Sequence, residues 1–362
     1  MRVQIVDPPA YTPPYDRALC AALARAGADV ELVTTRFPYG PVPEPRGYRV
    51  SELFYPIGAS REGADGVRRA LRVAQHVPGM LRLRGHARAA DLVHLQWLTA
   101  PAIDRHLLPE RPRVLTVHDP PAGRGVADLL ERMDAVIAHS QAGVARLRAL
   151  GLDPARVHRV AHGTFEHLTR QPDERPLPPD LAAVEGPVAL CFGLVRPYKG
   201  VDVLLEAFRE IEGAELWVVG LPRMPLGPLE ALAARCAATV RFVPKFITDP
   251  EIPAYFRRAD LVVLPYREIE QSGVLYTALA FGKPIVASDV GGFSEISELR
   301  LVPPGDPAAL ATALAELLGD PERRAELARA SVAAAVGEHS WDSVAERTLA
   351  VYRDVLERSA RR

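Results

Sequence analysis

Short apolar runs alternate with longer amphipathic stretches along the first half of the chain. Helical spacing is clearest at 15–27 and in the stretch that ends at Leu150. Runs with the length and composition of buried strands lie at 2–6, 30–35, 92–98, 113–119, 135–140 and 157–163. Continuous apolar strands separated by helices are typical of a parallel sheet that is covered on both faces. The first half therefore predicts an α/β domain.

A stretch without periodicity interrupts this alternation. Residues 170–180 read RQPDERPLPPD, which is rich in proline and charge and is typical of a linker. Beyond it the alternation restarts, and the tail at 321–360 has helical spacing. Strands are predicted at 187–193, 215–220, 239–243, 260–266 and 284–289, with helices at 201–211, 229–236 and 274–281. We predict two doubly wound α/β domains, at 1–169 and 187–342, joined by a linker at 170–186.

Bulk composition narrows the class of protein. At 362 residues the chain is too long for one typical core and suits two domains. A net charge of −1 removes any general attraction to nucleic acid, so no nucleic-acid partner is expected. Cys20, Cys191 and Cys236 have neither zinc nor disulfide spacing. The chain opens on a strand without a signal peptide, and no apolar run nears the roughly 20 residues that span a bilayer, which favours a cytoplasmic location.

Two cations stand close together where a predicted strand ends. The sequence CFGLVRPYKG places Arg196 and Lys199 between the strand at 187–193 and the helix at 201–211. Backbone N–H groups at the start of a helix favour anions, and a flanking arginine and lysine add to that preference. A diphosphate fits this arrangement, because arginine can bond two oxygens while lysine acts as a point charge. A solvated turn is the alternative.

A second helix start follows a later strand of the same domain. The sequence QSG opens the helix at 274–281, so N–H groups from about Ser272 to Val274 can meet the same diphosphate. Gly291 and Gly292 follow the next strand and permit a close backbone approach to a ligand or to the other domain. A turn without a ligand is again the alternative.

These features together resemble a known family. Over essentially its full length the chain resembles the retaining glycosyltransferases of family 4, which have the GT-B fold. FGLVRPYKGVDVLLEAF matches the donor-phosphate stretch of that family, and ADLVVLPY with SGVLYTALAFGKPIVASDVGGFSEI matches its most recognisable signature. VLTVHD, VIAHS and VAHG match landmarks of the N-terminal domain, and HSWDSVAERTLAVYRDVL matches the terminal helices.

The resemblance implies a fold and a reaction. Two Rossmann-like domains would face each other across a cleft, with the C-terminal helix at 343–362 returning to the first domain. The second domain would hold a nucleoside-diphosphate sugar of the UDP or GDP type, and a glycan, lipid or small molecule would be the acceptor. Arg196 and Lys199 would stabilise the charge that builds up on the leaving diphosphate. Such enzymes use these cations in place of a metal, and the chain has no Asp-x-Asp cluster, so neither metal nor cofactor is expected.

One departure from the family concerns the signature itself. The family usually has two glutamates eight positions apart, and those positions hold Ile269 and Thr277 here, within a QSGV variant of the signature. We expect Gln271, together with Glu270, to contact hydroxyls of the transferred sugar, and Thr277 to meet the ribose. The expected donor-binding residues are Gly193, Lys245, Glu270, Gln271, Ser272, Gly273, Val274 and Thr277.

Three histidines end predicted strands of the first domain. By resemblance His118, in TVHD, binds a hydroxyl of the donor sugar and joins Arg196 and Lys199 in the catalytic set; a histidine that caps a core strand is the alternative. His139 and His162 occupy the corresponding strand ends. They are expected to shape the cleft.

The loop at 7–18 differs from the paired glycines that the family has there. It contains four prolines and two tyrosines, which make it rigid and aromatic. Aromatic faces suit sugar rings. Tyr11, Tyr15 and Asp16 are therefore the expected acceptor-side residues, with a simply packed loop as the alternative.

A basic amphipathic segment lies at 67–88. Its arginines are Arg68, Arg69, Arg72, Arg82, Arg84 and Arg88. Such segments can bind membrane surfaces or phosphorylated lipids, so peripheral contact with the inner face of the membrane is one hypothesis. In an arginine-rich chain, a solvated helix face is the other.

We predict transfer of a hexosyl unit to an acceptor hydroxyl with retention at the anomeric carbon. No carboxylate is placed as a nucleophile, which favours a same-face reaction in which the departing phosphate deprotonates the acceptor. Two alternatives stay open. A nucleotide-sugar 2-epimerase of the same architecture would want more acidic residues in its cleft. A non-catalytic sugar-nucleotide or glycan-binding partner would bind the donor without releasing a nucleoside diphosphate.

Overall fold

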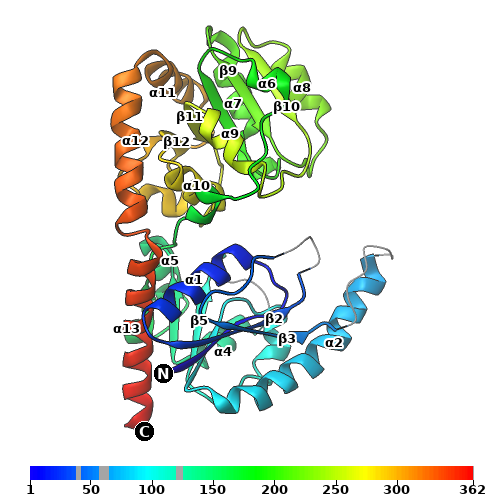
Figure 1. Cartoon of the computed structure of the whole chain (residues 1–362), viewed down its shortest axis with the longest axis vertical. Helices are drawn as coiled ribbons and strands as arrows, with labels where there is room; N and C mark the ends of the chain where they lie inside the picture. The colour runs from blue at the N-terminus through cyan, green and yellow to red at the C-terminus, as the bar shows by residue number, and fades with distance from the viewer. Residues whose placement is uncertain (38–41, 57–64, 120–124, 362) are drawn as a thin grey trace. The chain divides into compact units, whose positions relative to one another are not determined.

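The computed structural model describes residues 1–37, 42–56, 65–119 and 125–361, with the side chains of the helix that begins at 65 described from residue 74. It divides into two compact units (Figure 1). Unit 1 comprises Met1–Gly163 and Trp341–Arg362, and unit 2 comprises Thr164–Ser340. Each unit is a parallel sheet covered by helices, which confirms the predicted α/β class.

Unit 1 is a doubly wound sheet with the strand order β3-β2-β1-β4-β5-β6-β7. All of its strand pairs are parallel. The order reverses between β1 and β4, because the chain moves from β1 towards β3 and then from β4 towards β7. The strands are β1 (Arg2–Asp7), β2 (Asp29–Thr35), β3 (Arg49–Phe54), β4 (Leu92–Leu95), β5 (Arg113–Val117), β6 (Ala135–Ala138) and β7 (Val157–Arg159).

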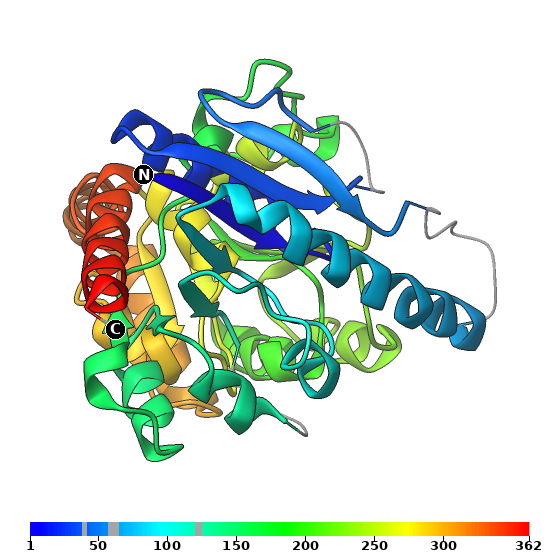
Figure 2. The ribbon, with the colours of Figure 1, turned by 90° about the horizontal axis from the view of Figure 1, so that it is seen from below.

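The helices of unit 1 cover both faces of this sheet. They are α1 (Pro13–Arg25), α2 (Asp65–His86), α3 (Pro101–Asp104), α4 (Val126–Glu131), α5 (Gln141–Ala149) and α13 (Trp341–Ala360), with short 3-10 turns between them. The helix α2 packs against the edge strand β3 (Figure 2). One apolar cluster, which includes Val6, Val93 and Val136 at less than 2% exposure, fills the space between the sheet and the helices on that face.

Unit 2 repeats the design with the strand order β10-β9-β8-β11-β12-β13. Its order reverses between β8 and β11, so the loops that follow these two strands start side by side at one edge of the sheet. Its strands are β8 (Val188–Phe192), β9 (Glu215–Val219), β10 (Thr239–Val243), β11 (Leu261–Leu264), β12 (Ile285–Ser288) and β13 (Arg300–Val302). Its helices are α6 (Pro179–Ala182), α7 (Val201–Ala207), α8 (Gly227–Ala233), α9 (Ile252–Arg258), α10 (Gly273–Ala280), α11 (Pro307–Gly319) and α12 (Pro321–Val336).

The last helix returns to unit 1, as expected. Its buried positions repeat at helical spacing, and α13 packs along α1 (Figure 1). Tyr352 is fully buried, and its hydroxyl lies 2.6 Å from Nδ1 of His94 on β4. The backbone of Gly163 approaches the Trp341 ring so closely that a Cβ would lie 2.5 Å from it.

The segment expected to be a linker packs on unit 2. The Arg175 N–H donates to the carbonyl of Pro250 (2.7 Å), and Leu181 of α6 is buried in the unit 2 core. The boundaries of the units fall at 163 and 340, whereas 169 and 342 were expected. Leu177 and Val184 pack against the same core, and the prolines and charges between these apolar residues leave no periodic pattern that would predict the contact.

Two edge strands, β3 and β13, were not predicted. Positions on β3 are mostly half-buried or exposed, and β13 has three residues, so neither forms a continuous apolar run. No helix in the described part of the chain combines the length and the apolarity that crossing a membrane requires.

Candidate active site

The loop between β8 and α7 carries Arg196 and Lys199 at the carboxyl edge of the unit 2 sheet. Arg196 has extended backbone and precedes a 3-10 turn, Pro197–Lys199. Gly200 follows in the left-handed region with a φ of 64° and starts α7. A Cβ at Gly200 would lie 2.0 Å from the carbonyl oxygen of Pro265, so only glycine permits this approach to the loop after β11.

Lys199 is buried, although it is a lysine in a loop. Its Nζ donates to the Tyr266 hydroxyl (2.8 Å) and more weakly to the carbonyl of Phe192 (3.4 Å), and it lies 4.8 Å from the centre of the Tyr266 ring. Burial acts to lower the pKa of Lys199, but the contacts with Tyr266 outweigh it and raise that pKa above its ordinary value. The site therefore holds a buried, charged ammonium group.

Arg196 contrasts with Lys199 in its surroundings. Its side chain is exposed and makes no hydrogen bond or ion pair with any residue that the structure describes. A neighbouring cation, Arg267, is paired: it binds Asp202 at 2.6 Å and the carbonyl of Pro197 at 2.8 Å. These bonds join the two loops, so Arg267 is engaged within unit 2 while Arg196 is open to a ligand.

The start of α10 lies against the same two loops. The Ser272 hydroxyl is 3.2 Å from that of Tyr266. Within the described residues, the N–H groups of Gly273 and Val274 make no hydrogen bond, as is usual for the first turn of a helix. Gly193 follows β8 and lies close to both Lys199 and the start of α10. A Cβ at this position would lie 3.0 Å from Lys199 Nζ and 3.1 Å from the Val274 side chain.

The structure thus joins Gly193, Lys199, Ser272, Gly273 and Val274 in one place. Tyr266 connects them, and sequence reasoning did not single it out. The residue ends an apolar strand run, VVLPY, where a tyrosine is expected to be a core residue. Its position beside the Arg196–Lys199 loop follows from the pairing of β8 with β11, which the sequence does not show.

The residues around the missing glutamates are tied within unit 2. Ile269 packs on the apolar core, and the Thr277 hydroxyl donates to the Gly273 carbonyl of its own helix (2.8 Å). The Gln271 side-chain oxygen accepts a hydrogen bond from the Tyr276 hydroxyl. Glu270 is buried, and its carbonyl accepts from the Gly292 N–H (3.3 Å).

The paired glycines make close backbone approaches within unit 2. A Cβ at Gly291 would lie 1.8 Å from the carbonyl of Ile269, and one at Gly292 would lie 2.5 Å from the Gln271 amide. Both glycines therefore make room for the loop at 269–271 of the same unit. They fix the backbone from which Gln271 projects.

Lys245 lies apart from this cluster. It follows the edge strand β10 and forms an ion pair with Glu251 (2.6 Å), while half of its side chain is exposed. The structure shows no contact between Lys245 and the other expected donor-binding residues.

His118 directly follows β5 in unit 1 and is buried. Its Nδ1 lies 3.2 Å from His139 Nε2, and its Nε2 lies 3.0 Å from the Gln96 side-chain oxygen. Its ring stacks on Trp97 with 5.0 Å between centroids. Burial lowers the pKa of His118 well below its ordinary value, and His139 and His162 lower it further, so the ring is neutral at neutral pH.

The hydrogen-bond partners of His139 and His118 determine which ring nitrogen of each histidine carries a hydrogen. The Val160 carbonyl can only accept, so His139 Nδ1 (2.9 Å away) carries a hydrogen. In the neutral pair, His139 Nε2 then accepts from His118 Nδ1. His118 Nε2 is left without a hydrogen, and the Gln96 amide must turn its nitrogen towards it. Both ring nitrogens of His118 are therefore engaged within unit 1.

The other histidines and Tyr15 pack together inside unit 1. The Tyr15 ring lies 4.9 Å from His118, 5.5 Å from His139, 4.8 Å from His162 and 5.1 Å from Trp341. Tyr15 is buried, so its ring supports the histidines and is not an open face for an acceptor.

The loop between β1 and α1 is held by buried carboxyl groups. Asp7 accepts from the backbone N–H groups of Tyr11 (2.6 Å) and Thr12 (3.2 Å). Asp16 is buried and accepts weakly from the Thr12 hydroxyl (3.4 Å), which places it under the loop. Of the three expected acceptor-side residues, Tyr11 alone is exposed, and its ring lies 4.8 Å from that of Trp97.

The basic segment is a helix for most of its length. Arg68, Arg69 and Arg72 lie outside the residues whose side chains are described. Arg82 donates to the Leu53 carbonyl and Arg84 pairs with Glu110, so two of the remaining arginines are engaged within unit 1.

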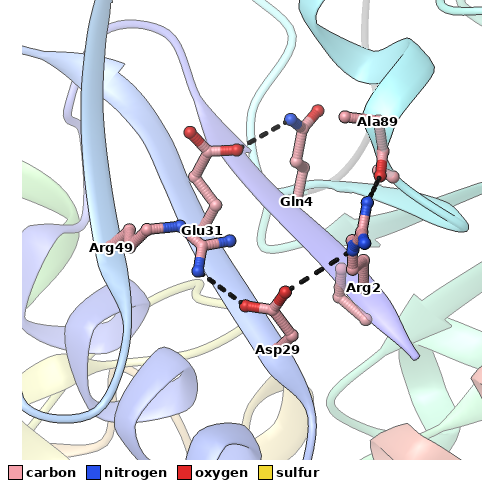
Figure 3. A pocket seen from close by; sticks show the side chains of 8 residues that line it. Arg2, Gln4, Asp29, Glu31, Arg49 and Ala89 are labelled. Carbon is pink, nitrogen blue, oxygen red and sulfur yellow. Dashed lines mark hydrogen bonds and ion pairs between the residues drawn. The ribbon is translucent and has the colours of Figure 1, made fainter.

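A pocket opens at the opposite, amino-terminal edge of the unit 1 sheet (Figure 3). Arg2 and Arg49 share Asp29 there, at 3.7 Å and 2.8 Å, and the Gln4 amide donates to Glu31 (2.9 Å). Charges in this pocket are paired with one another. Elsewhere in the described residues, no group of three or more His, Cys, Asp and Glu side chains is arranged to hold a metal ion.

Comparison with known proteins identifies the family. Residues 17–164 match the model of Glycosyltransferase Family 4, and residues 186–320 match that of Glycosyl transferases group 1. A D-inositol 3-phosphate glycosyltransferase of Xylanimonas cellulosilytica is 32% identical, over 95% of this chain and 91% of the relative. A GDP-mannose:glycolipid 4-beta-D-mannosyltransferase of Xanthomonas campestris is 36% identical over 27% of this chain and 29% of its own.

Solved structures show the same architecture. Sucrose-phosphate synthase from Thermosynechococcus elongatus superposes with a TM-score of 0.76 at 22% identity, covering 99% of both chains. Anabaena HepE in complex with UDP superposes with a TM-score of 0.72 at 18% identity, covering 98% of this chain and 100% of that one. Two parallel-sheet units with these neighbours define the GT-B class of glycosyltransferases. The chain belongs to glycosyltransferase family 4 within that class.

Proposed function

We propose that this glycosyltransferase moves a hexosyl unit from a nucleoside-diphosphate sugar of the UDP or GDP type to an acceptor hydroxyl on a glycan, lipid or small molecule. In this proposal the anomeric configuration is retained, and the reaction needs no metal. The buried, charged Lys199 beside the open helix start of α10 carries the proposal, because an ammonium group kept out of water favours an anion strongly.

Each part of the cluster has a role in this proposal. Lys199 and the unpaired Arg196 stabilise the charge on the departing diphosphate. The N–H groups of Gly273 and Val274 and the Ser272 hydroxyl bind its oxygens. Because Lys199 donates to the Tyr266 oxygen, the Tyr266 proton is directed to Ser272, whose own proton is then free for a phosphate oxygen.

The sugar would be recognised by residues beside the positions of the family's two glutamates. Gln271 keeps its amide nitrogen for a hydroxyl while its oxygen is held by Tyr276. Glu270 adds a carboxylate beside it, and Thr277 retains acceptor capacity for the ribose. His118 would bind a sugar hydroxyl through Nε2, in exchange for Gln96.

A same-face transfer fits these groups. The bond between the anomeric carbon and the phosphate oxygen breaks, the bond to the acceptor oxygen forms on the same face, and the acceptor proton passes to the departing phosphate. Positions 269 and 277 hold no carboxylate that could act as a nucleophile. The names of the neighbours, which include complexes with UDP and UDP-glucose and a GDP-mannose enzyme, support a diphosphate donor of either base.

Titration calorimetry with UDP and GDP tests the phosphate site. We expect one nucleotide to bind selectively, and Arg196→Ala or Lys199→Ala to weaken its binding by about 2 kcal/mol or more, roughly 30-fold, because a charge-assisted bond is lost. Arg235→Ala is the matched control, since Arg235 is an exposed arginine after α8, near the start of β10 at the opposite edge of the sheet. Absence of binding by either nucleotide to the folded protein would contradict the proposal.

Proton NMR of the first product tests retention. The anomeric coupling constant of the transferred sugar should match the configuration of the donor. An inverted product would rule out the same-face route, whatever the result for nucleotide binding.

A further inference from the structure

Two aromatic side chains flank the point where the unit 1 strand order reverses. Tyr11 follows β1 and Trp97 follows β4, and these two strands are neighbours in the sheet. In a doubly wound sheet the loops after such a pair of strands diverge, and ligands bind in the crevice that they leave. His118, behind Trp97, follows the next strand, β5.

The two rings form an open, layered surface. Tyr11 is 69% exposed, and its ring lies 4.8 Å from that of Trp97 with 39° between the planes. Trp97 stacks in turn on His118, with 14° between the planes. It is the layering of the exposed Tyr11 ring on Trp97 and His118, at an edge where ligands bind, that makes this surface a candidate for contact with a ligand.

Hydrogen bonds hold this surface in place. The buried Asp7 accepts from the backbone N–H of Tyr11 (2.6 Å), and Trp97 Nε1 donates to the Thr12 hydroxyl (2.9 Å). Prolines on both sides of Tyr11 restrict the backbone further. The rings are therefore preorganised, which reduces the entropy that a ligand loses on binding.

The charge of the residues that contact the two rings indicates which class of ligand the rings would bind. Among the described residues, the hydrogen bonds and ring contacts of Tyr11 and Trp97 involve Asp7, Thr12 and His118. None of these is Lys or Arg, and His118 is kept neutral by burial. Among the described residues, the groups that contact the two rings therefore offer no positive charge to a phosphate or carboxylate, whereas the apolar face of a neutral sugar ring packs well on an aromatic surface.

We propose that Tyr11 and Trp97 form a subsite for an uncharged sugar ring of the acceptor. This inference rests on the proposed function, in which unit 2 takes the charged donor. It separates this chain from relatives named for D-inositol 3-phosphate, because the acceptor ring that stacks at this point carries no phosphate. The acceptor is then a glycan or a glycolipid that presents a neutral terminal sugar.

Saturation-transfer NMR on the full chain tests the subsite. The probes are methyl glucoside, methyl mannoside, methyl galactoside, cellobiose and D-inositol 3-phosphate, each with and without saturating nucleoside diphosphate. We expect at least one neutral sugar to bind, and Tyr11→Ala to weaken it by about fivefold to tenfold. Trp97→Phe, which keeps a ring but loses the bond to Thr12, should weaken it less.

Two controls distinguish failure of the sugar subsite from failure of the proposed donor site. Phe246→Ala removes another aromatic side chain, 59% exposed, from unit 2 and should leave sugar binding unchanged. Thermal unfolding of Tyr11→Ala, followed by circular dichroism, should match that of the wild type, which shows that unit 1 is folded. Nucleotide affinity on the same sample should also equal that of the wild type, because the proposed donor site lies in unit 2. Failure of the wild type to bind either nucleotide would contradict the proposed donor site and not the sugar subsite.

Three results would overturn the subsite. The first is tighter binding of D-inositol 3-phosphate than of every neutral sugar. The second is neutral-sugar binding that Tyr11→Ala does not weaken. The third is failure of all neutral probes to bind while the nucleotide binds normally.

Discussion

At the scale of single residues, the candidate active site depends on how a buried lysine keeps its charge. Lys199 is removed from water, which by itself would favour the neutral amine. The Tyr266 hydroxyl at 2.8 Å and the face of its ring reverse that preference. Tyr266 is thus a positioning residue in the proposed mechanism, acting on the ligand through Lys199 and Ser272.

Tyr266→Phe should weaken nucleoside-diphosphate binding by about fivefold to tenfold, because Lys199 loses a hydrogen-bond acceptor. It should also lower the pKa of Lys199, since less then opposes the effect of burial. The charged amine exists below that pKa, so the fall in affinity as pH rises should begin at a lower pH in the variant. Calorimetry with UDP and GDP from about pH 7 to 10 measures both effects.

Tyr255→Phe is the matched control for this substitution. Tyr255 is buried in the same unit, and its hydroxyl finds no hydrogen-bond partner within the described residues. Its removal should change neither the affinity nor the pH profile. If the two variants behave alike, the phenol of Tyr266 does not govern the state of Lys199.

At the scale of elements, the β1–α1 loop rests on a pair of buried carboxyl groups. Oδ1 of Asp7 and Oδ1 of Asp16 meet no donor, and two carboxyl groups can bond each other only when one holds a proton. Burial raises the pKa of Asp7, and burial together with the charge of Asp7 raises the pKa of Asp16 well above its ordinary value. We therefore expect the stability of the loop that carries Tyr11 to depend on pH.

Asp16→Asn should stabilise the protein, and more so as pH rises. Because the folded pKa values are raised, the wild-type pair contributes its full stability below the ordinary aspartate pKa and loses it as pH rises through the folded values. The asparagine supplies an N–H to Asp7 without a titrating proton. Urea unfolding should show a gain of about 1 kcal/mol near pH 8 and little or none near pH 4.

Asp173→Asn is the control for that series, because Asp173 is exposed and has no partner among the described residues. It should leave the pH dependence of unfolding unaltered. A gain in Asp16→Asn that does not vary with pH would mean that the pair does not share a proton.

At the scale of the whole molecule, the chain passes between the two units twice. Unit 2 is built from one continuous segment, whereas unit 1 needs residues from both ends of the chain. The helix α13 buries Trp341, Val344, Tyr352 and Val355 in unit 1. Burial of each such side chain contributes about 1.5–3 kcal/mol to the free energy of unfolding. The sum is comparable to the total stability of a typical domain, so α13 supplies much of the stability of unit 1.

Removal of residues 341–362 should therefore unfold unit 1, at a cost of roughly 5 kcal/mol or more, and leave unit 2 folded. Thermal unfolding followed by circular dichroism should lose one transition, and nucleotide binding should persist. Truncation after Ala360, which removes the exposed Arg361 and the final residue of the sequence, is the control and should leave thermal unfolding unchanged. A full-amplitude transition in the long truncation would show that α13 is dispensable.

Much of the fold could be predicted from the sequence. Continuous apolar runs with helices between them are sufficient to predict parallel sheets, since a strand buried on both faces cannot alternate with polar residues. The exceptions lack a local signal: β3 and β13 have no continuous apolar run, and Leu181 lies with Leu177 and Val184 among prolines and charges. Interrupted apolar runs and scattered apolar residues leave no periodic signal.

For the candidate site, the sequence by itself determined where the charges stand. Arg196 and Lys199 had to lie in the turn between β8 and α7, and the start of α10 had to offer free N–H groups, because both follow from local patterns. The resemblance of its motifs to family 4 also predicted the class of reaction, which is glycosyl transfer.

The tertiary structure alone decided which of these residues meet and which are open. The pairing of β8 with β11 brings Tyr266 to Lys199, and the pairing of β1 with β4 brings Tyr11 to Trp97. It also buries Tyr15 and Asp16 and leaves Tyr11 exposed, although all three lie within a few positions of one another. Strand order and burial depend on contacts between residues far apart in the chain, and no local pattern encodes them.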